Sequence, residues 1–114
     1  MAKLPGETKS AIVNLLMALG ELIDEAGKTE LAIFEQFGET ETSIPILEQL
    51  QDARERLRNP YNRLCTLFLN IAESQPNASA AVLNLLYQTI EQAQANADAV
   101  TATIEESKRD IDLL

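Results

Sequence analysis

Apolar residues recur every three or four positions through residues 79–114, the last third of the chain. This heptad spacing is sustained for about five repeats and predicts one long α-helix. Such a helix would be roughly 50 Å long, whereas a compact protein of this size is about 35 Å across. It therefore needs a long partner, in the same chain or in another copy. We call its apolar positions the heptad seam: Leu83, Leu86, Ile90, Ala93, Ala97, Val100, Ile104 and Ile111.

A second long helix is predicted over residues 45–74, with Ser43 as its cap. Its apolar stripe continues in nearly the same register beyond Asn59 and Pro60. Two interpretations follow: one helix that Pro60 kinks, or a new helix that Asn59 caps. We prefer the nearly continuous helix because the phase of the stripe is kept. The segment Ser-Gln-Pro-Asn at residues 74–77 then separates this helix from the heptad helix.

The first third of the chain predicts two shorter helices. Residues 8–26 carry one apolar face, and Gly27 acts as a C-terminal stop. Residues 29–37 then form a short helix that ends at Gly38. Residues 38–43 are acidic and rich in hydroxyl groups, which is typical of a loop.

Two features of this region can each be interpreted in two ways. Leu31, Phe34 and Phe37 share one side of the short helix. We expect them to close the end of the bundle, and a binding patch is the alternative. Gly20 lies inside the first helix, where a glycine costs about 1 kcal/mol relative to alanine. Close approach of another helix would explain it, and so would a tolerated defect.

Together these elements predict an all-α antiparallel bundle of about four helices, formed by one domain over residues 1–114. The two long segments, 45–74 and 79–112, pair as a hairpin, and the two N-terminal helices pack along it. The positions that flank the heptad seam are mostly uncharged, which is untypical of a free two-stranded zipper. We therefore expect two hairpins to pair through the seam into a dimeric bundle. A monomeric four-helix bundle is the alternative.

Composition narrows the class of protein. Apolar residues make up 46% and aromatic residues 4% of the 114 positions, which favours helices packed on helices over disorder. Nine Lys and Arg stand against eighteen Asp and Glu, a formal net charge of -9 that argues against nucleic acid as a partner. No apolar run is long enough to cross a bilayer, and the N-terminus lacks a signal-peptide pattern. With a single cysteine, these features predict a cytoplasmic protein.

The residues needed for catalysis or metal binding are scarce. The chain has no histidine, which removes the commonest general base and the usual metal ligand. Its four glycines are scattered, and the acidic residues do not follow the spacing of a calcium-binding loop. We expect Cys65 to be a small buried hydrophobe, with a redox sensor as the alternative. The sequence therefore predicts no catalytic residue, cofactor or metal site.

Two charged features are candidates for binding. Four arginines lie within ten residues, close to Tyr61, and either pair with acidic residues of the first helix or hold an anion or an acidic partner. An almost wholly acidic column runs along the heptad helix and forms either a solvated face or a site for a basic partner. The arginines are Arg54, Arg56, Arg58 and Arg63, and the column consists of Asn84, Glu91, Asp98, Glu105 and Asp112.

From these observations we expect a non-enzymatic helical interaction protein, an adaptor or a regulator, that forms a homodimer and binds another protein. The alternative is an amphipathic coat protein that opens its bundle on a lipid or polymer surface. The acidic polar faces argue against this alternative, because helices that bind anionic membranes usually carry many lysines.

Overall fold

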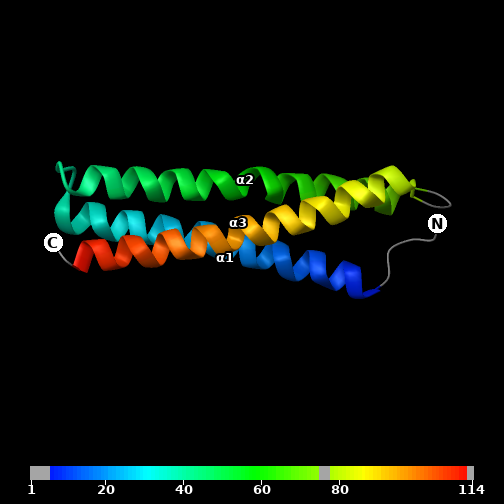
Figure 1. The fold of residues 1–114 in the computed structure, drawn as a ribbon, viewed down its shortest axis with the longest axis horizontal. Helices are drawn as coiled ribbons and strands as arrows, with labels where there is room; N and C mark the ends of the chain where they lie inside the picture. Colours follow the sequence, from blue (N-terminus) through cyan, green and yellow to red (C-terminus); the bar gives the residue numbers. More distant parts are fainter. Residues whose placement is uncertain (1–5, 75–77, 113–114) are drawn as a thin grey trace.

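The computed structural model describes residues 6–74 and 78–112, which form three long α-helices (Figure 1). These are α1 (Gly6–Phe37), α2 (Ser43–Glu73) and α3 (Ala80–Asp112). α1 and α3 run in the same direction, and α2 runs against both (Figure 1). The all-α prediction and the hairpin of the two long segments are confirmed. The predicted count of about four helices is wrong for the described residues, because the first two predicted helices are one.

The predicted break at Gly27 does not occur. Ile12, Leu19, Ala26 and Ile33 are buried at steps of seven along α1, so the apolar face keeps its phase across the glycine. Thr29 lies inside α1 and not at the start of a separate helix. Its Oγ1 donates a hydrogen bond to the Glu25 carbonyl at 2.8 Å, as a hydroxyl inside a continuous helix does. Burial of one uninterrupted face thus outweighs the low helix propensity of a single glycine.

The end of α1 agrees with the sequence. Gly38 has φ of +65°, a left-handed conformation that glycine adopts without steric cost. Its amide donates to the Phe34 carbonyl at 2.8 Å and so closes the last turn. The loop then delivers Ser43, which is fully buried, to the start of α2. The Ser43 hydroxyl donates to the Gly38 carbonyl at 2.7 Å and accepts from the Thr40 amide at 2.9 Å.

α2 is one helix through Pro60, as the phase of its stripe predicts. Pro60 itself is buried and occupies a core position between Leu57 and Leu64. α2 ends at Glu73, and Ser79 caps α3 by accepting a hydrogen bond from the Val82 amide at 3.2 Å.

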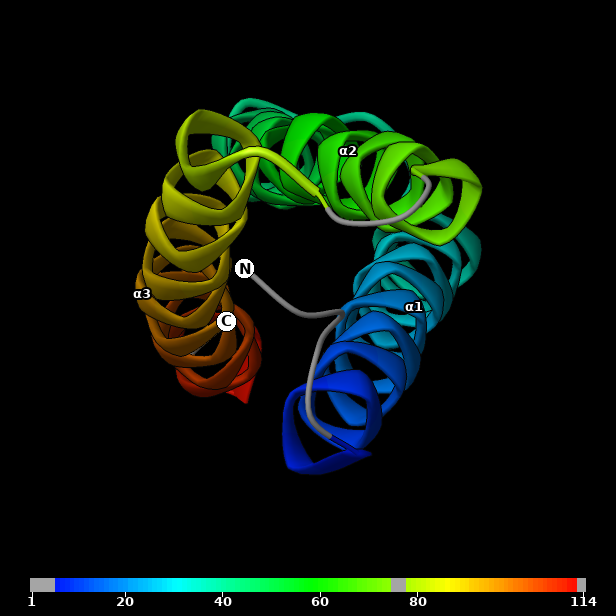
Figure 2. The same ribbon diagram turned by 90° about the vertical axis from the view of Figure 1, so that its right-hand side faces the viewer.

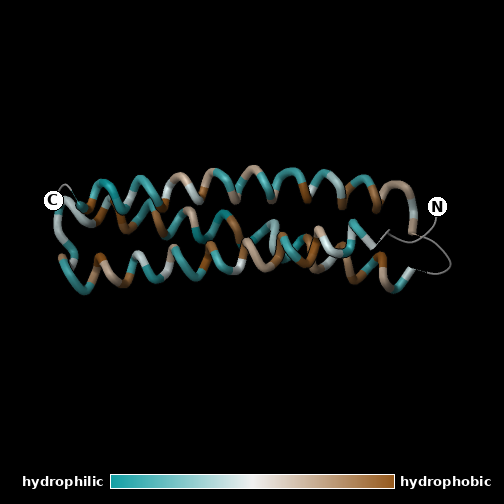
Figure 3. Tube along the Cα trace, turned by 90° about the horizontal axis from the view of Figure 1, so that it is seen from below, coloured by the Kyte–Doolittle hydropathy of each residue, from teal (hydrophilic) through white to brown (hydrophobic). Residues whose placement is uncertain are grey.

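The helices share one elongated core. The molecule measures 57 × 18 × 17 Å, and seen end-on α2 lies between α1 and α3, which also contact each other (Figure 2). Hydrophobic positions recur along all three helices between hydrophilic ones (Figure 3). The length of α3 therefore needs no second subunit, because its long partners lie in the same chain. The buried apolar residues are Ile12, Leu15, Leu19, Ala26, Ile33, Ile46, Leu50, Ala53, Leu57, Leu64, Leu67, Ile71, Ala78, Leu83, Leu86, Ala93, Val100 and Ile104.

Within the described helices no segment is both long and apolar enough to span a membrane.

Two fully buried serines differ in their hydrogen bonds, and this difference predicts opposite mutational effects. Ser107 Oγ has no hydrogen-bond partner, whereas Ser43 Oγ has several. A buried hydroxyl without a hydrogen-bond partner destabilises the fold, because it has lost its hydrogen bonds to water and gained none. Ser107→Ala should therefore raise the free energy of unfolding by about 1 kcal/mol. Ser43→Ala should lower it by about 1 kcal/mol, because it leaves loop backbone groups unpaired. Urea denaturation followed by circular dichroism measures both, and changes of the same sign would contradict the prediction.

Candidate functional site

The heptad seam lies inside the chain's own bundle. Leu83, Leu86, Ala93, Val100 and Ile104 are buried in the common core. The other three members, Ile90, Ala97 and Ile111, are half-buried and pack against that core. Because these side chains already have partners in the same chain, the seam offers little free surface to a second copy. A dimer through the seam stays a prediction that a single chain does not test.

The arginine cluster does not converge on one site. Arg54 and Tyr61 lie on the flank of α2 that faces α1. Arg56 lies on the opposite flank, beside Thr103 and Glu106 of α3. Arg58 and Arg63 are exposed. Helical spacing thus divides the four cations between two sides of α2, and they cannot hold one anion together.

Arg54 has a structural partner. Its Nε donates to Glu30 Oε2 at 2.9 Å and its Nη2 to Glu30 Oε1 at 3.4 Å, so the guanidinium holds the carboxylate with two bonds. The sequence predicted acidic partners on the helix over residues 8–26; the partner of Arg54, Glu30, lies beyond that range, in the segment predicted as a separate short helix.

The Glu30–Arg54 pair also marks the register of α1 against α2. Counting from it by one heptad in opposite directions sets Ile23 level with Tyr61 and Phe37 level with Leu47. A further heptad sets Leu16 level with Phe68. All six are half-buried hydrophobic residues that pack against the core, so one charged layer lies within an apolar flank. A one-heptad slip of α1 would place these charges against apolar side chains, and the pair therefore favours the observed register.

A double-mutant cycle tests this structural role. Arg54→Ala and Glu30→Ala should each destabilise the fold, with a coupling energy of about 1 kcal/mol, because the pair is bidentate and only partly exposed. The Asp24–Lys28 pair of α1 is a matched control: it is 3.0 Å long but well exposed, so its coupling should be much smaller. Equal coupling in the two cycles would contradict the assignment.

A second apolar stripe runs along the outside of α1. We call it the outer α1 face; at 100° per residue its centre lies about 140° from that of the buried residues of this helix, on the side bordered by α2. Met17 is 61% and Leu31 is 58% exposed, and Val13 and Phe34 are about half exposed. These four are half of the eight large hydrophobic side chains exposed in the described part of the chain. The face comprises Val13, Met17, Gly20, Asp24, Gly27, Leu31 and Phe34, at alternating steps of four and three.

This face bears on two predictions: that Leu31 and Phe34 close the end of the bundle, and that another helix approaches Gly20 closely. Leu31 and Phe34 do not close the end of the bundle, since Leu31 is mostly exposed and Phe34 is half exposed beside Ile44 and Leu47 of α2; of the three, Phe37 packs on the core. Gly20 and Gly27 have open space where a Cβ would be, so neither of the other two described helices approaches them closely. A hollow adjoins Gly20, lined by Val13, Leu16, Met17, Glu21, Asp24 and Tyr61. Exposed apolar side chains around glycines form the one extended apolar surface of α1 that no other described helix covers.

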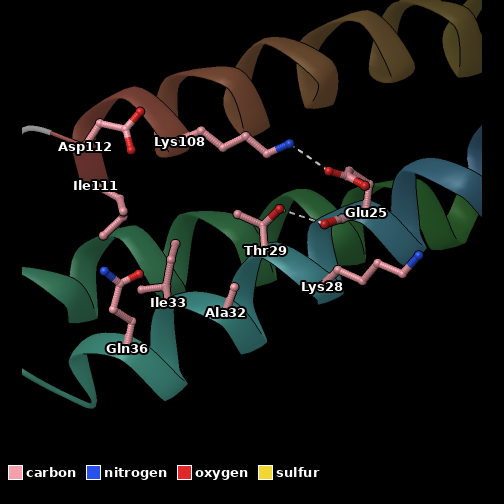
Figure 4. Close-up of a pocket in the computed structure, with 9 residues that line it drawn as sticks. All are labelled: Glu25, Lys28, Thr29, Ala32, Ile33, Gln36, Lys108, Ile111 and Asp112. Carbon is pink, nitrogen blue, oxygen red and sulfur yellow. Dashed lines mark hydrogen bonds and ion pairs between the residues drawn. The ribbon is translucent and has the colours of Figure 1, made fainter.

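A groove separates the second half of α1 from the end of α3 (Figure 4). Its apolar floor consists of Ala32, Ile33 and Ile111. Across its mouth, Lys108 Nζ donates to Glu25 Oε1 at 2.7 Å (Figure 4). This ion pair joins the two parallel helices.

The Glu25–Lys108 pair predicts a pH effect. The hydrogen bond from Lys108, helped by its positive charge, lowers the pKa of Glu25 below its ordinary value. A carboxyl whose pKa is lowered by folding adds stability above its unfolded pKa, about 4.3 for glutamate, and loses it as pH falls through the folded value. Wild type should therefore lose more stability than Glu25→Gln between about pH 5 and about pH 3. Urea midpoints across this range measure the difference, and identical pH profiles would contradict it.

The remaining reactive groups lie apart. Cys65 is exposed, which corrects the expectation of a buried thiol: the core positions are Leu64 and Leu67, and position 65 faces outward. Among the described residues no three Cys, Asp or Glu side chains gather as metal ligands would. The acidic column of α3 is exposed along its whole length.

No protein-family model, curated protein or solved structure matches this chain.

Proposed function

We propose that this chain is a non-enzymatic interaction protein, an adaptor or a regulator, that forms a dimer and binds another protein. The observation that carries the proposal is the outer α1 face. The three helices already satisfy one another's heptad positions, yet α1 keeps a second apolar stripe in solvent. Large exposed apolar side chains in one row usually mark a protein contact, because the row has no structural use within the chain.

The charge distribution supports a protein partner for the dimer. The acidic column of α3 and the net charge of -9 would attract a basic surface and repel nucleic acid. Arg56, Arg58 and Arg63 are exposed but spread over two flanks, which suits a contact area rather than a pocket for one anion.

Affinity capture from an extract of the native host tests the proposal. The bait proteins are wild type, a variant of the outer α1 face (Met17→Glu with Leu31→Glu), and a control with the same charge change (Ala11→Glu with Ala18→Glu). Both control positions are exposed on α1 but lie outside the outer α1 face. Wild type and control should retain the same proteins, identified by mass spectrometry, and the face variant should lose them. Equal retention by all three baits, or no protein above an empty matrix, would overturn the proposal.

A further inference from the structure

We propose that the outer α1 face binds the same face of a second copy of this chain, with the two α1 helices antiparallel. This inference rests on the proposed function, because it names the occupant of that surface. A two-fold dimer uses one patch twice, so the patch must be complementary to itself when it is reversed. The outer α1 face meets this condition in the order of its residues, in its shape and in its charges.

The order of residues is nearly the same in both directions. From either end, a large apolar side chain is followed by a second one and then by a glycine. In an antiparallel pair centred on Asp24, position n lies beside a position close to 48 − n. Val13 then meets Phe34 of the second copy, and Met17 meets Leu31 of the second copy. Every large exposed side chain of the face is thereby covered by another.

The shape of the face is also self-complementary. Gly20 and Gly27 lie on either side of the centre, and the space above both is open. With no Cβ at these positions, the two helix backbones can approach closely there. The hollow beside Gly20 lies level with Leu31 and Phe34 of the second copy, whose side chains project from α1 and can fill it. By symmetry the same contact occurs twice.

Charges select the antiparallel direction. Glu21 lies level with Lys28 of the second copy, so two pairs of opposite charge flank the centre. Asp24 meets its own counterpart near the axis, but each carboxylate is already paired with Lys28 of its own chain at 3.0 Å. In a parallel pair, the equivalent flanks of the two helices lie on opposite sides of the contact, so Glu21 and Lys28 would form no such pairs.

The size of the face predicts a reversible dimer. From Val13 to Phe34 it spans roughly 32 Å at 1.5 Å per residue, and it is one helix wide. An interface of this extent is smaller than that of an obligate dimer, and both chains are acidic. We therefore expect a dissociation constant in the micromolar range, with tighter pairing as salt screens the net charge.

Charge exchange between two variants tests both the surface and the direction. Met17→Lys and Leu31→Glu, analysed separately by sedimentation equilibrium of the purified chain, should each weaken the dimer at least about tenfold. An equimolar mixture should restore it, because Lys at 17 meets Glu at 31 while Leu31 meets Met17. Ala11→Lys and Ala18→Glu alter exposed positions of the same helix that lie outside the face and its flanking charges, and should change nothing. Circular dichroism establishes that every variant remains folded, as substitutions at exposed positions should.

Each outcome decides the inference. A wild type that stays monomeric at several hundred micromolar, or single variants that dimerise like wild type, would overturn it. Weakened single variants without recovery in the mixture would also overturn it, because they exclude the antiparallel register. These measurements use no host protein, so a monomer that still captures partners through the outer α1 face would overturn this inference and the proposed dimer, while the proposed binding of another protein would stand.

Discussion

Replacing Leu57 with alanine should lower the free energy of unfolding by about 2–5 kcal/mol, a large part of the stability of a protein this small. Leu57 is 0% exposed and lies midway along α2, the helix that packs against both others. Truncation leaves a cavity that the surrounding heptad positions cannot fill without moving a helix. Urea denaturation followed by circular dichroism gives the value directly.

Leu69 provides the matched control for this truncation. It is also a leucine of α2, but its side chain is 57% exposed. Leu69→Ala should therefore change the free energy of unfolding by less than about 0.5 kcal/mol. If both variants lost similar stability, the assignment of Leu57 to the core and Leu69 to the surface of α2 would be contradicted.

Enlarging Ala93 to leucine should destabilise the fold by about 1–3 kcal/mol. Ala93 is 0% exposed and lies near the middle of α3, where a small side chain lets the helix approach its neighbours. A leucine there forces side chains out of their rotamers or separates the helices. Thermal and urea denaturation of the purified variant measure the loss.

Ala95→Leu is the control, because Ala95 is exposed only two positions away and leucine is nearly as good a helix former as alanine. It should leave stability almost unchanged. The two variants also distinguish packing of the heptad seam within the chain from packing of the seam against a second copy. If Ala93 faced a second copy rather than α1 and α2, Ala93→Leu would change the oligomeric state at little cost to the folded monomer.

The sequence was informative wherever one apolar face continued without interruption. The phase of the α2 stripe across Pro60 predicted a single helix, and the left-handed glycine at position 38 was predicted as a helix end. α2 ends at Glu73 and α3 begins at Ala80, on either side of the break predicted at residues 74–77, of which 75–77 lie outside the described residues. These features depend on local periodicity and on backbone chemistry, which a sequence displays directly.

Gly27 shows where local signals mislead. A glycine followed by Lys28 and Thr29 resembles a helix end, but burial of Ala26 and Ile33 on one continuous face keeps α1 helical. Because the prediction divided α1 at Gly27, it missed the outer α1 face, whose spacing is regular only when residues 13–34 form one helix. In the sequence, this face is visible as a second heptad pattern over residues 13–34.

Partner choice could not be predicted from periodicity. The heptad seam indicates that α3 packs on long helices, but the pattern is the same whether these belong to its own chain or to another. Likewise, the arginine cluster is compact in sequence yet lies on two flanks of α2, because consecutive helical residues point in different directions.

Oxidative cross-linking tests the antiparallel α1 pair most directly. Asp24 lies at the proposed two-fold centre, so Asp24→Cys in a Cys65→Ser background should form a covalent dimer rapidly and completely under mild oxidation. Val13→Cys in the same background should not, because its two copies would lie roughly 33 Å apart along the helix axes. Cross-linking at both positions would indicate a parallel pair, and cross-linking at neither would show that the outer α1 face does not bind a second copy.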